Sequence, residues 1–107
     1  MYSIKKDKNI NLIRKVINQE SPESEIILFG SRVSGDVNDS SDYDILIKIK
    51  KNMSVAEKRS LSSRIRKGLA EKLIDSDVIV KDEAEISGSL DKPGSVIKEA
   101  VLNGIKL

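Results

Sequence analysis

Residues 26–36 read IILFGSRVSGD, and residues 41–48 read SDYDILIK. The first four residues of this stretch form an apolar run that stops at Gly30, which predicts a short buried strand. The second stretch alternates apolar and polar residues and predicts a strand over 42–50. The intervening residues 30–41 are rich in Gly, Ser, Asp and Asn and predict a loop with one helical turn. Such a connection is too short for a full crossover helix, so the two strands can pair antiparallel.

Helical and extended patterns flank this stretch on both sides. Apolar residues recur at helical spacing over 7–20, and Ser21-Pro22 ends that helix. A longer helix is expected over 54–73, where Ser54 and Glu57 match a capping box. The following elements are a third strand over 77–80, a helical turn over 82–87 and a last helix over 95–103, which Gly104 is expected to close at its C′ position.

The inward faces of the later helices complete the expected core. In the 54–73 helix the apolar stripe consists of Leu61, Ile65, Leu69 and Leu73. In the last helix the inward residues are expected to be Val96, Ile97, Ala100 and Val101. The order of elements favours one α/β (α+β) domain over 1–107, with a small mixed β-sheet flanked by helices.

The composition restricts the chemistry. The 107 residues include no His and no Cys, which excludes disulfides, zinc sites of the Cys/His type, thiol nucleophiles and a histidine base. Catalysis must therefore use carboxylates, hydroxyls, Lys, Arg, Tyr or a cation held by oxygen ligands. No apolar run reaches the length of a membrane span and no signal peptide is evident, so we expect a cytoplasmic protein without a membrane partner.

Three carboxylates and one turn are the candidate site. Asp42 and Asp44 share one face of their strand, and two like charges so close favour a bound Mg²⁺ or Mn²⁺. Asp77 begins the third strand and would face them if the strands are neighbours, although Asp75 is an alternative third ligand. Gly30 and the residues from Ser31 onward could direct backbone N–H groups at a phosphate, or form an ordinary tight turn.

These residues resemble a known family. Gly30-Ser31, ten further residues and then Asp42-Tyr43-Asp44 are similar to the signature of minimal nucleotidyltransferases (MNT type) of the DNA polymerase beta superfamily. The order of helices and strands is similar over nearly the whole chain, which implies the minimal nucleotidyltransferase fold. One difference is visible at Val33-Ser34-Gly35, where many relatives carry a small apolar residue and Arg before the second Gly.

The resemblance implies a role for each matched residue. Gly30, Ser31 and Arg32 would bind the phosphates of an incoming NTP, although Arg32 could equally be an ordinary surface residue. Asp42, Asp44 and Asp77 would be the catalytic, metal-binding carboxylates, and Asp77 would also help to deprotonate the acceptor hydroxyl. The implied reaction is metal-dependent transfer of a nucleoside monophosphate, with AMP from ATP expected.

The resemblance also implies a partner. Minimal nucleotidyltransferases are often encoded beside a helical HEPN protein, and in toxin–antitoxin pairs of this kind the MNT chain adenylylates a HEPN tyrosine. We therefore expect a HEPN-type partner, in a hetero-oligomer. The alternative is a non-catalytic antitoxin that neutralises its partner by docking alone.

Charge is unevenly distributed along the chain. Residues 48–72 carry a net charge of +7, whereas the whole chain carries +2. This segment is typical of a solvated helix face, and its alternative is a docking surface for an acidic partner or for RNA. Tyr2, Phe29 and Tyr43 are the only aromatic residues, which argues against nucleic-acid binding by base stacking.

Overall fold

The computed structural model describes residues 3–34 and 42–107. A 3₁₀ turn, η1 (Ile4–Lys6), precedes helix α1 (Ile10–Glu20) and strand β1 (Glu25–Phe29). The single helical turn expected after Gly30 is α2 (Ser31–Ser34), and residues 35–41 of the predicted loop lie outside the described residues. The chain continues through β2 (Tyr43–Ile49), α3 (Val55–Glu71), β3 (Ser76–Asp82), α4 (Glu83–Leu90), α5 (Val96–Asn103) and β4 (Ile105–Lys106).

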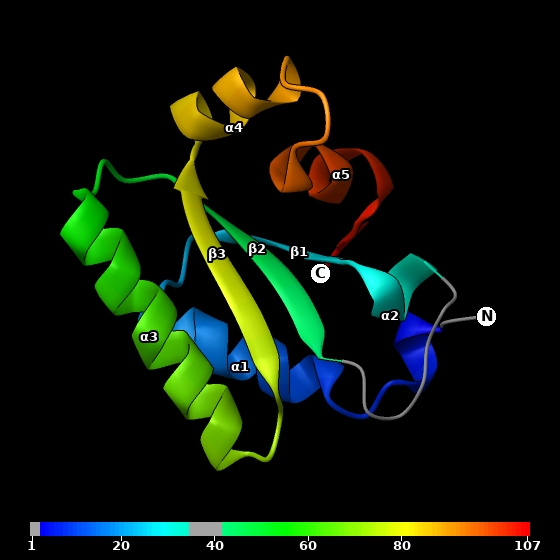
Figure 1. Cartoon of the computed structure of the whole chain (residues 1–107). Coiled ribbons are helices and arrows are strands. Elements are labelled where there is room, and N and C mark those ends of the chain that lie inside the picture. Colours follow the sequence, from blue (N-terminus) through cyan, green and yellow to red (C-terminus); the bar gives the residue numbers. More distant parts are fainter. Residues whose placement is uncertain (1–2, 35–41) are drawn as a thin grey trace.

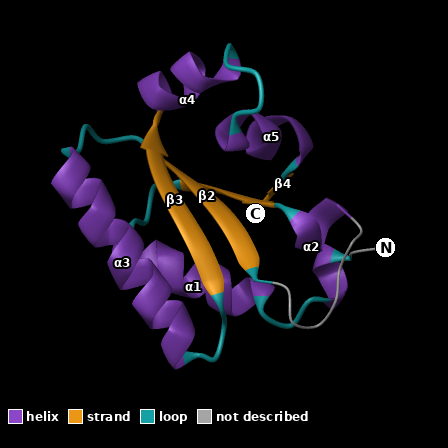
Figure 2. Cartoon of the chain, viewed as in Figure 1, coloured by secondary structure: helices purple, strands orange, loops and turns teal. Residues whose placement is uncertain are grey.

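The strands form one mixed sheet in the order β3-β2-β1-β4 (Figures 1 and 2). β1 and β2 pair antiparallel, as their short connection predicts, and β2 and β3 pair parallel across α3. The two-residue strand β4 pairs antiparallel with β1 and was not predicted. The expected small mixed sheet flanked by helices is therefore confirmed.

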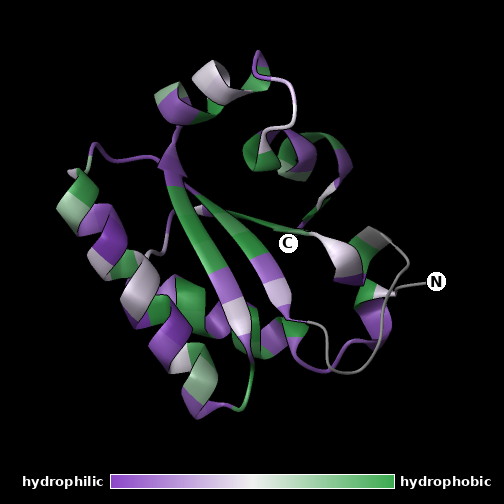
Figure 3. Ribbon diagram, viewed as in Figure 1, coloured by the Kyte–Doolittle hydropathy of each residue, from purple (hydrophilic) through white to green (hydrophobic). Residues whose placement is uncertain are grey.

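Each face of the sheet is covered by a pair of helices. Side chains of α1 and α3 pack with Ile45, Ile47 and Val78 in the larger core, and Ile86 of α4 and Ala100 of α5 pack with Leu46 on the other face. The middle of β2 and β3 is hydrophobic, whereas the start of each strand is hydrophilic (Figure 3). None of the helices among the described residues is long and apolar enough to cross a membrane.

Two helix boundaries differ from the prediction. The first helix begins at Ile10 rather than at residue 7, because Asp7 and its neighbours close the preceding 3₁₀ turn. α4 is longer than the single turn expected, because Asp82 and Glu85 form a reciprocal capping box at its start. The capping box predicted for Ser54 and Glu57 is present at the start of α3.

Leu73 was wrongly assigned to the apolar stripe of α3. The helix ends at Glu71, and Leu73 lies beyond it with φ +61° and 94% of its surface exposed. Its N–H donates to the Ala70 carbonyl (2.9 Å), and the Ile74 N–H donates to the Leu69 carbonyl (3.0 Å). These two bonds define a Schellman motif, in which Leu73 occupies the left-handed position that usually holds Gly.

The end of α5 also differs from the prediction. Val96 and Val101 are exposed rather than inward, and Ala100 is the buried residue of this helix. Gly104 follows the helix in an extended conformation, with φ −78°, rather than in a left-handed one. It is needed for close approach instead, because a Cβ there would lie 2.4 Å from the Ala100 carbonyl oxygen and 2.5 Å from Ile27 Cγ2.

Candidate active site

Asp44 and Asp77 lie side by side on adjacent parallel strands, where they are partners in the β2–β3 register. Residues two apart on a strand share a face, so Asp44 lies on the same face as Leu46, which packs beneath α4 and α5. The pair is therefore at the start of both strands and on the side of the sheet that α5 covers. Asp77 is exposed and Asp44 is partly buried.

The turn after β1 lies directly against this pair. Gly30 has φ +84°, and a Cβ built on it would lie 2.0 Å from Asp44 Oδ2. Only glycine allows both the left-handed backbone and this approach of the carboxylate. α2 begins at the next residue, Ser31, whose side chain is exposed. The predicted phosphate-binding turn and the predicted carboxylates are thus neighbours in the fold.

The pKa of the Asp44 carboxyl is affected by its burial and by the acidic residues around it. Partial burial raises the pKa of the Asp44 carboxyl above its usual value, and the negative charges of Asp77, Asp42 and Glu99 raise it further. Asp42 immediately precedes β2 and is exposed. Glu99 comes from α5, and sequence analysis did not identify it. The one sequence feature that could have pointed to Glu99 is its position one residue before the buried Ala100.

Tyr43, between the two aspartates, anchors the N-terminal segment. Its hydroxyl donates to the Asp7 carboxylate (2.7 and 2.8 Å) and accepts a hydrogen bond from Asn9 Nδ2 (3.2 Å). Burial and the Asp7 carboxylate raise the pKa of the Tyr43 hydroxyl. The guanidinium carbon of Arg32 lies 4.1 Å from the centroid of the Tyr43 ring. Arg32, the predicted phosphate contact, thus stacks on Tyr43.

Asp75 occupies a different place from Asp77. It precedes β3 in an exposed turn, and its backbone carbonyl accepts the Tyr43 N–H (3.0 Å). Asp77, by contrast, is the register partner of Asp44 and contributes to its raised pKa. Among residues 3–34 and 42–107, no three carboxylates lie close enough together to form a ready-made metal site.

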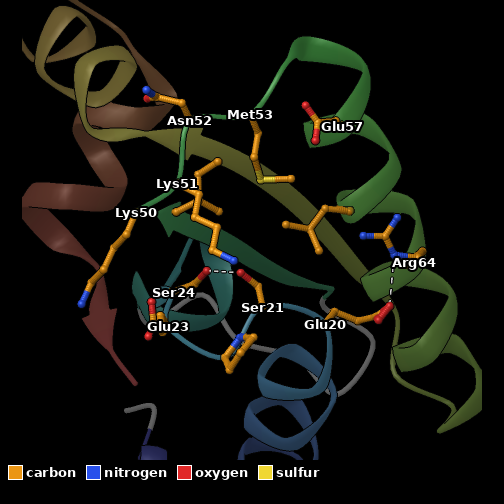
Figure 4. A pocket seen from close by; sticks show the side chains of 13 residues that line it. Glu20, Ser21, Glu23, Ser24, Lys50, Lys51, Asn52, Met53, Glu57 and Arg64 are labelled. Atoms are coloured by element: carbon orange, nitrogen blue, oxygen red, sulfur yellow. Dashed lines mark hydrogen bonds and ion pairs between the residues drawn. The ribbon is translucent and has the colours of Figure 1, made fainter.

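A hollow lies at the opposite end of the sheet. The pocket of Figure 4 has a volume of about 510 Å³ and is lined by the α1–β1 turn, the β2–α3 loop and α3. Glu20 and Arg64 form an ion pair across it (3.1 Å), and the hydroxyls of Ser21 and Ser24 are hydrogen-bonded to each other. Because these groups satisfy one another, the pocket offers less reactive chemistry than the Asp44–Asp77 end.

Comparison with known proteins identifies the family of the chain. Residues 11–105 match the family described as polymerase beta, nucleotidyltransferase. The chain belongs to this nucleotidyltransferase family. It is also similar to the crystal structure of a candidate nucleotidyltransferase from Sulfolobus solfataricus, with 27% identity and a TM-score of 0.58, over 90% of this chain and 76% of that one. No curated protein gives a significant match.

Proposed function

We propose that the protein transfers AMP from Mg-ATP to a hydroxyl group of a partner protein, with a tyrosine of a HEPN-type helical protein as the acceptor. The observation that carries the proposal is the Asp44–Asp77 pair beside the Gly30 turn. Membership of the polymerase beta nucleotidyltransferase family supports nucleotidyl transfer in general. The acceptor and the partner rest on the resemblance of the Gly-Ser and Asp-x-Asp motifs.

The donor chemistry of the site fits a divalent cation. Carboxylate oxygens are the ligands that Mg²⁺ and Mn²⁺ prefer. Burial raises the pKa of Asp44, and so do the neighbouring like charges, which such a cation would neutralise. Asp42, Asp44 and Asp77 would hold it. The bound cation would supply Lewis acidity and orient the phosphates.

The remaining residues would position the reactants. The backbone at Gly30 and Ser31 would bind the β- and γ-phosphates, with Arg32 as a further phosphate contact. Asp77 would accept the proton of the acceptor hydroxyl. The hydroxyl oxygen would then form a bond to the α-phosphorus as the bond to pyrophosphate breaks, so that AMP is transferred and pyrophosphate leaves.

Labelled ATP tests this reaction. With a HEPN-type partner present, label from the α-phosphate should move onto the partner, and label from the γ-phosphate should leave as pyrophosphate. Asp77→Asn should reduce transfer by about a hundredfold or more, since charge stabilisation of this kind contributes strongly to catalysis, but the complex should still form. Asp75→Asn is the matched control and should retain most of the activity.

The binding-only alternative predicts a different result. If Asp77→Asn protects cells from the partner as well as the wild type does, neutralisation is by docking and the enzymatic proposal is wrong. If Asp75→Asn abolishes transfer and Asp77→Asn does not, the reaction stands but the third carboxylate is Asp75.

A further inference from the structure

The outer strand β3 and the neighbouring helix α3 enclose two adjoining hollows. One has a volume of about 510 Å³ and includes Val78, Ile79 and Val80 in its lining. The other, of about 340 Å³, reaches to Asp75 and Ser76. Ser63 and Arg66 line both hollows, so that together they follow β3 along its length. We call this the β3 groove.

Within residues 3–34 and 42–107, one side of β3 has no neighbouring strand, because β3 is the last strand of the sheet that they form. Tyr43 N–H donates to the Asp75 carbonyl, and in a parallel ladder alternate residues bond to the same neighbour. The backbone groups of Ser76, Val78 and Val80 therefore face the groove. The Val78 carbonyl accepts a hydrogen bond from Ser62 Oγ of α3 (2.8 Å) on that side, which agrees with this assignment.

The groove contains polar groups that other groups of the protein do not satisfy. Ser76 Oγ is buried, and it has no hydrogen-bond partner within the described residues. The N–H groups of Val78 and Val80 likewise have no partner in the described part of the chain. An unpaired strand edge is a template on which another strand can pair.

The groove is also positively charged. Arg59, Arg66 and Lys67 are exposed along its α3 side and form no ion pair within residues 3–34 and 42–107. Lys58 is paired instead with Glu85 and Asp82, and Lys81 is paired with Glu85, so the two carboxylates balance the two lysines at that end of the groove. In the described part of the chain, Glu85 and Asp75 are the only carboxylates that line either hollow.

We propose that the β3 groove binds an extended, acidic segment of a partner protein, which pairs with the open edge of β3. Its backbone would bond to Ser76, to Val80 and to the Val78 N–H, and the carboxylates on its α3-facing side would meet Arg59, Arg66 and Lys67. Unlike the proposed function, this inference does not depend on catalysis. It also assigns a binding role to the basic segment, residues 48–72, with an acidic polypeptide as its ligand.

Two other occupants fit less well. Binding of single-stranded RNA relies on stacking against aromatic residues, and neither of the described aromatic residues, Phe29 and Tyr43, lines either hollow. A second copy of the chain, paired through the same edge, would bring the arginines of both copies together, which like-charge repulsion disfavours.

Amide hydrogen exchange tests the proposal on the intact chain. The probe is a capped, fluorescein-labelled octapeptide of alternating Glu and Val. Its addition at millimolar concentration should slow exchange at Val78 and Val80 by about tenfold or more, because these N–H groups would gain partners. Exchange at Asp77 and Ile79, which already bond to β2, should change little.

Matched variants test the charge contribution by fluorescence anisotropy. Arg66→Glu should weaken binding of the Glu-Val peptide by roughly fivefold to tenfold, as expected for reversal of an exposed charge. Lys15→Glu, which makes the same charge change on the exposed side of α1, should leave binding within about twofold.

Four results would overturn the proposal. The first two are unchanged exchange at Val78 and Val80 when the Glu-Val peptide is added, and an equal loss of peptide binding in Arg66→Glu and Lys15→Glu. The third is equal binding of a Lys-Val octapeptide. The fourth is that the Glu-Val peptide does not bind whereas an octauridylate RNA does, and that Arg66→Glu abolishes this RNA binding.

Discussion

The φ of +84° at Gly30 and the 2.0 Å separation between its hypothetical Cβ and Asp44 Oδ2 make this residue intolerant of any side chain. Gly30→Ala should lower the free energy of unfolding by more than about 1 kcal/mol, because alanine is strained in the left-handed region and its methyl group displaces the carboxylate. Urea denaturation of the two proteins measures the difference.

A double-mutant cycle separates the two causes. In an Asp44→Ala background the carboxylate is absent and only the Cβ of residue 44 remains close, at 3.0 Å, so Gly30→Ala should cost little more than the backbone strain of about 1 kcal/mol. An equal loss of stability in both backgrounds would show that the methyl group at residue 30 does not clash with the Asp44 carboxylate.

The raised pKa of Asp44 gives a second prediction for a single residue. Because folding favours the protonated carboxyl, Asp44 destabilises the metal-free protein at neutral pH, and this penalty disappears as the pH falls below the ordinary aspartate value of about 4. Asp44→Asn should therefore be more stable than the wild type at about pH 7 and lose that advantage near pH 3. Thermal unfolding without divalent cations measures both.

Carboxyl titration by NMR identifies the neighbouring charge. Asp77→Asn should lower the pKa of Asp44 toward its ordinary value, whereas Asp75→Asn should change it less, since burial raises this pKa together with the charges of Asp77, Asp42 and Glu99. A larger effect of Asp75→Asn on the pKa of Asp44 would show that Asp75, and not Asp77, is the neighbouring carboxylate.

Local sequence indicated part of this site and missed another part. Asp44 and Asp77 each come directly before an apolar strand, so parallel pairing of those strands sufficed to bring them together. The contributions of Glu99 to the pKa of Asp44 and of Tyr43 to the anchoring of Asp7 depend on how distant segments pack. Periodicity and motif spacing contain no information on such contacts.

At the scale of elements, Leu73 shows where periodicity misleads. The spacing from Leu69 to Leu73 is helical, but the helix has ended and Leu73 itself has the left-handed conformation, with its side chain 94% exposed. The buried contact of the Schellman motif is instead made by Ile74 with Leu69. Capping boxes, by contrast, are local: Ser54 with Glu57 was predicted correctly, and Asp82 with Glu85 has the same spacing.

Leu73→Gly should stabilise the protein. Glycine removes the strain of a left-handed leucine, which is worth about 1 kcal/mol even after the greater freedom of glycine in the unfolded chain reduces the gain. The urea midpoint should rise. Lys72→Gly, at a neighbouring position with φ −95°, is the control and should be destabilising. A loss of stability in Leu73→Gly would mean that the exposed side chain makes a stabilising contact.

The cluster of Lys58, Asp82 and Glu85 joins α3 to the start of α4. Lys58 Nζ donates to Asp82 Oδ2 (3.0 Å) and to Glu85 Oε1. A hydrogen bond from the Glu85 N–H and the contact with Lys58 lower the pKa of Asp82, and Lys58 likewise lowers that of Glu85. Carboxyls whose pKa is lowered by folding stabilise the native state above their ordinary pKa and lose this contribution as acid protonates them.

Lys58→Met should therefore destabilise the protein at neutral pH, and the difference from the wild type should shrink below about pH 4. Thermal unfolding across this range measures the difference. A constant difference at all pH values would assign the role of Lys58 to packing of its aliphatic chain rather than to its charge.

At the scale of the whole molecule, ligand binding should report on the candidate site. A ligand that binds only the native state stabilises it, and at about ten times its Kd the gain is roughly 1.4 kcal/mol, or about 5 °C in Tm for a domain of this size. Mg-ATP should raise the Tm of the wild type and of Asp75→Asn. The shift should be small for Asp42→Asn, Asp44→Asn and Asp77→Asn.

ATP without a divalent cation is the control and should give a smaller shift than Mg-ATP. The absence of any shift in the wild type at millimolar Mg-ATP would contradict the site. A shift retained in Asp44→Asn would place nucleotide binding elsewhere in the molecule.

The pairing of β4 with β1 has a consequence for how this domain is made. β1 is flanked in the finished sheet by β2 on one side and by β4 on the other, where the Leu107 N–H donates to the Ile26 carbonyl (2.8 Å). β1 is translated before residues 30–104, so this edge of an apolar strand has no β4 to pair with until the end of the sheet has been made. Chaperones that recognise extended apolar segments would find their target in the nascent chain at β1.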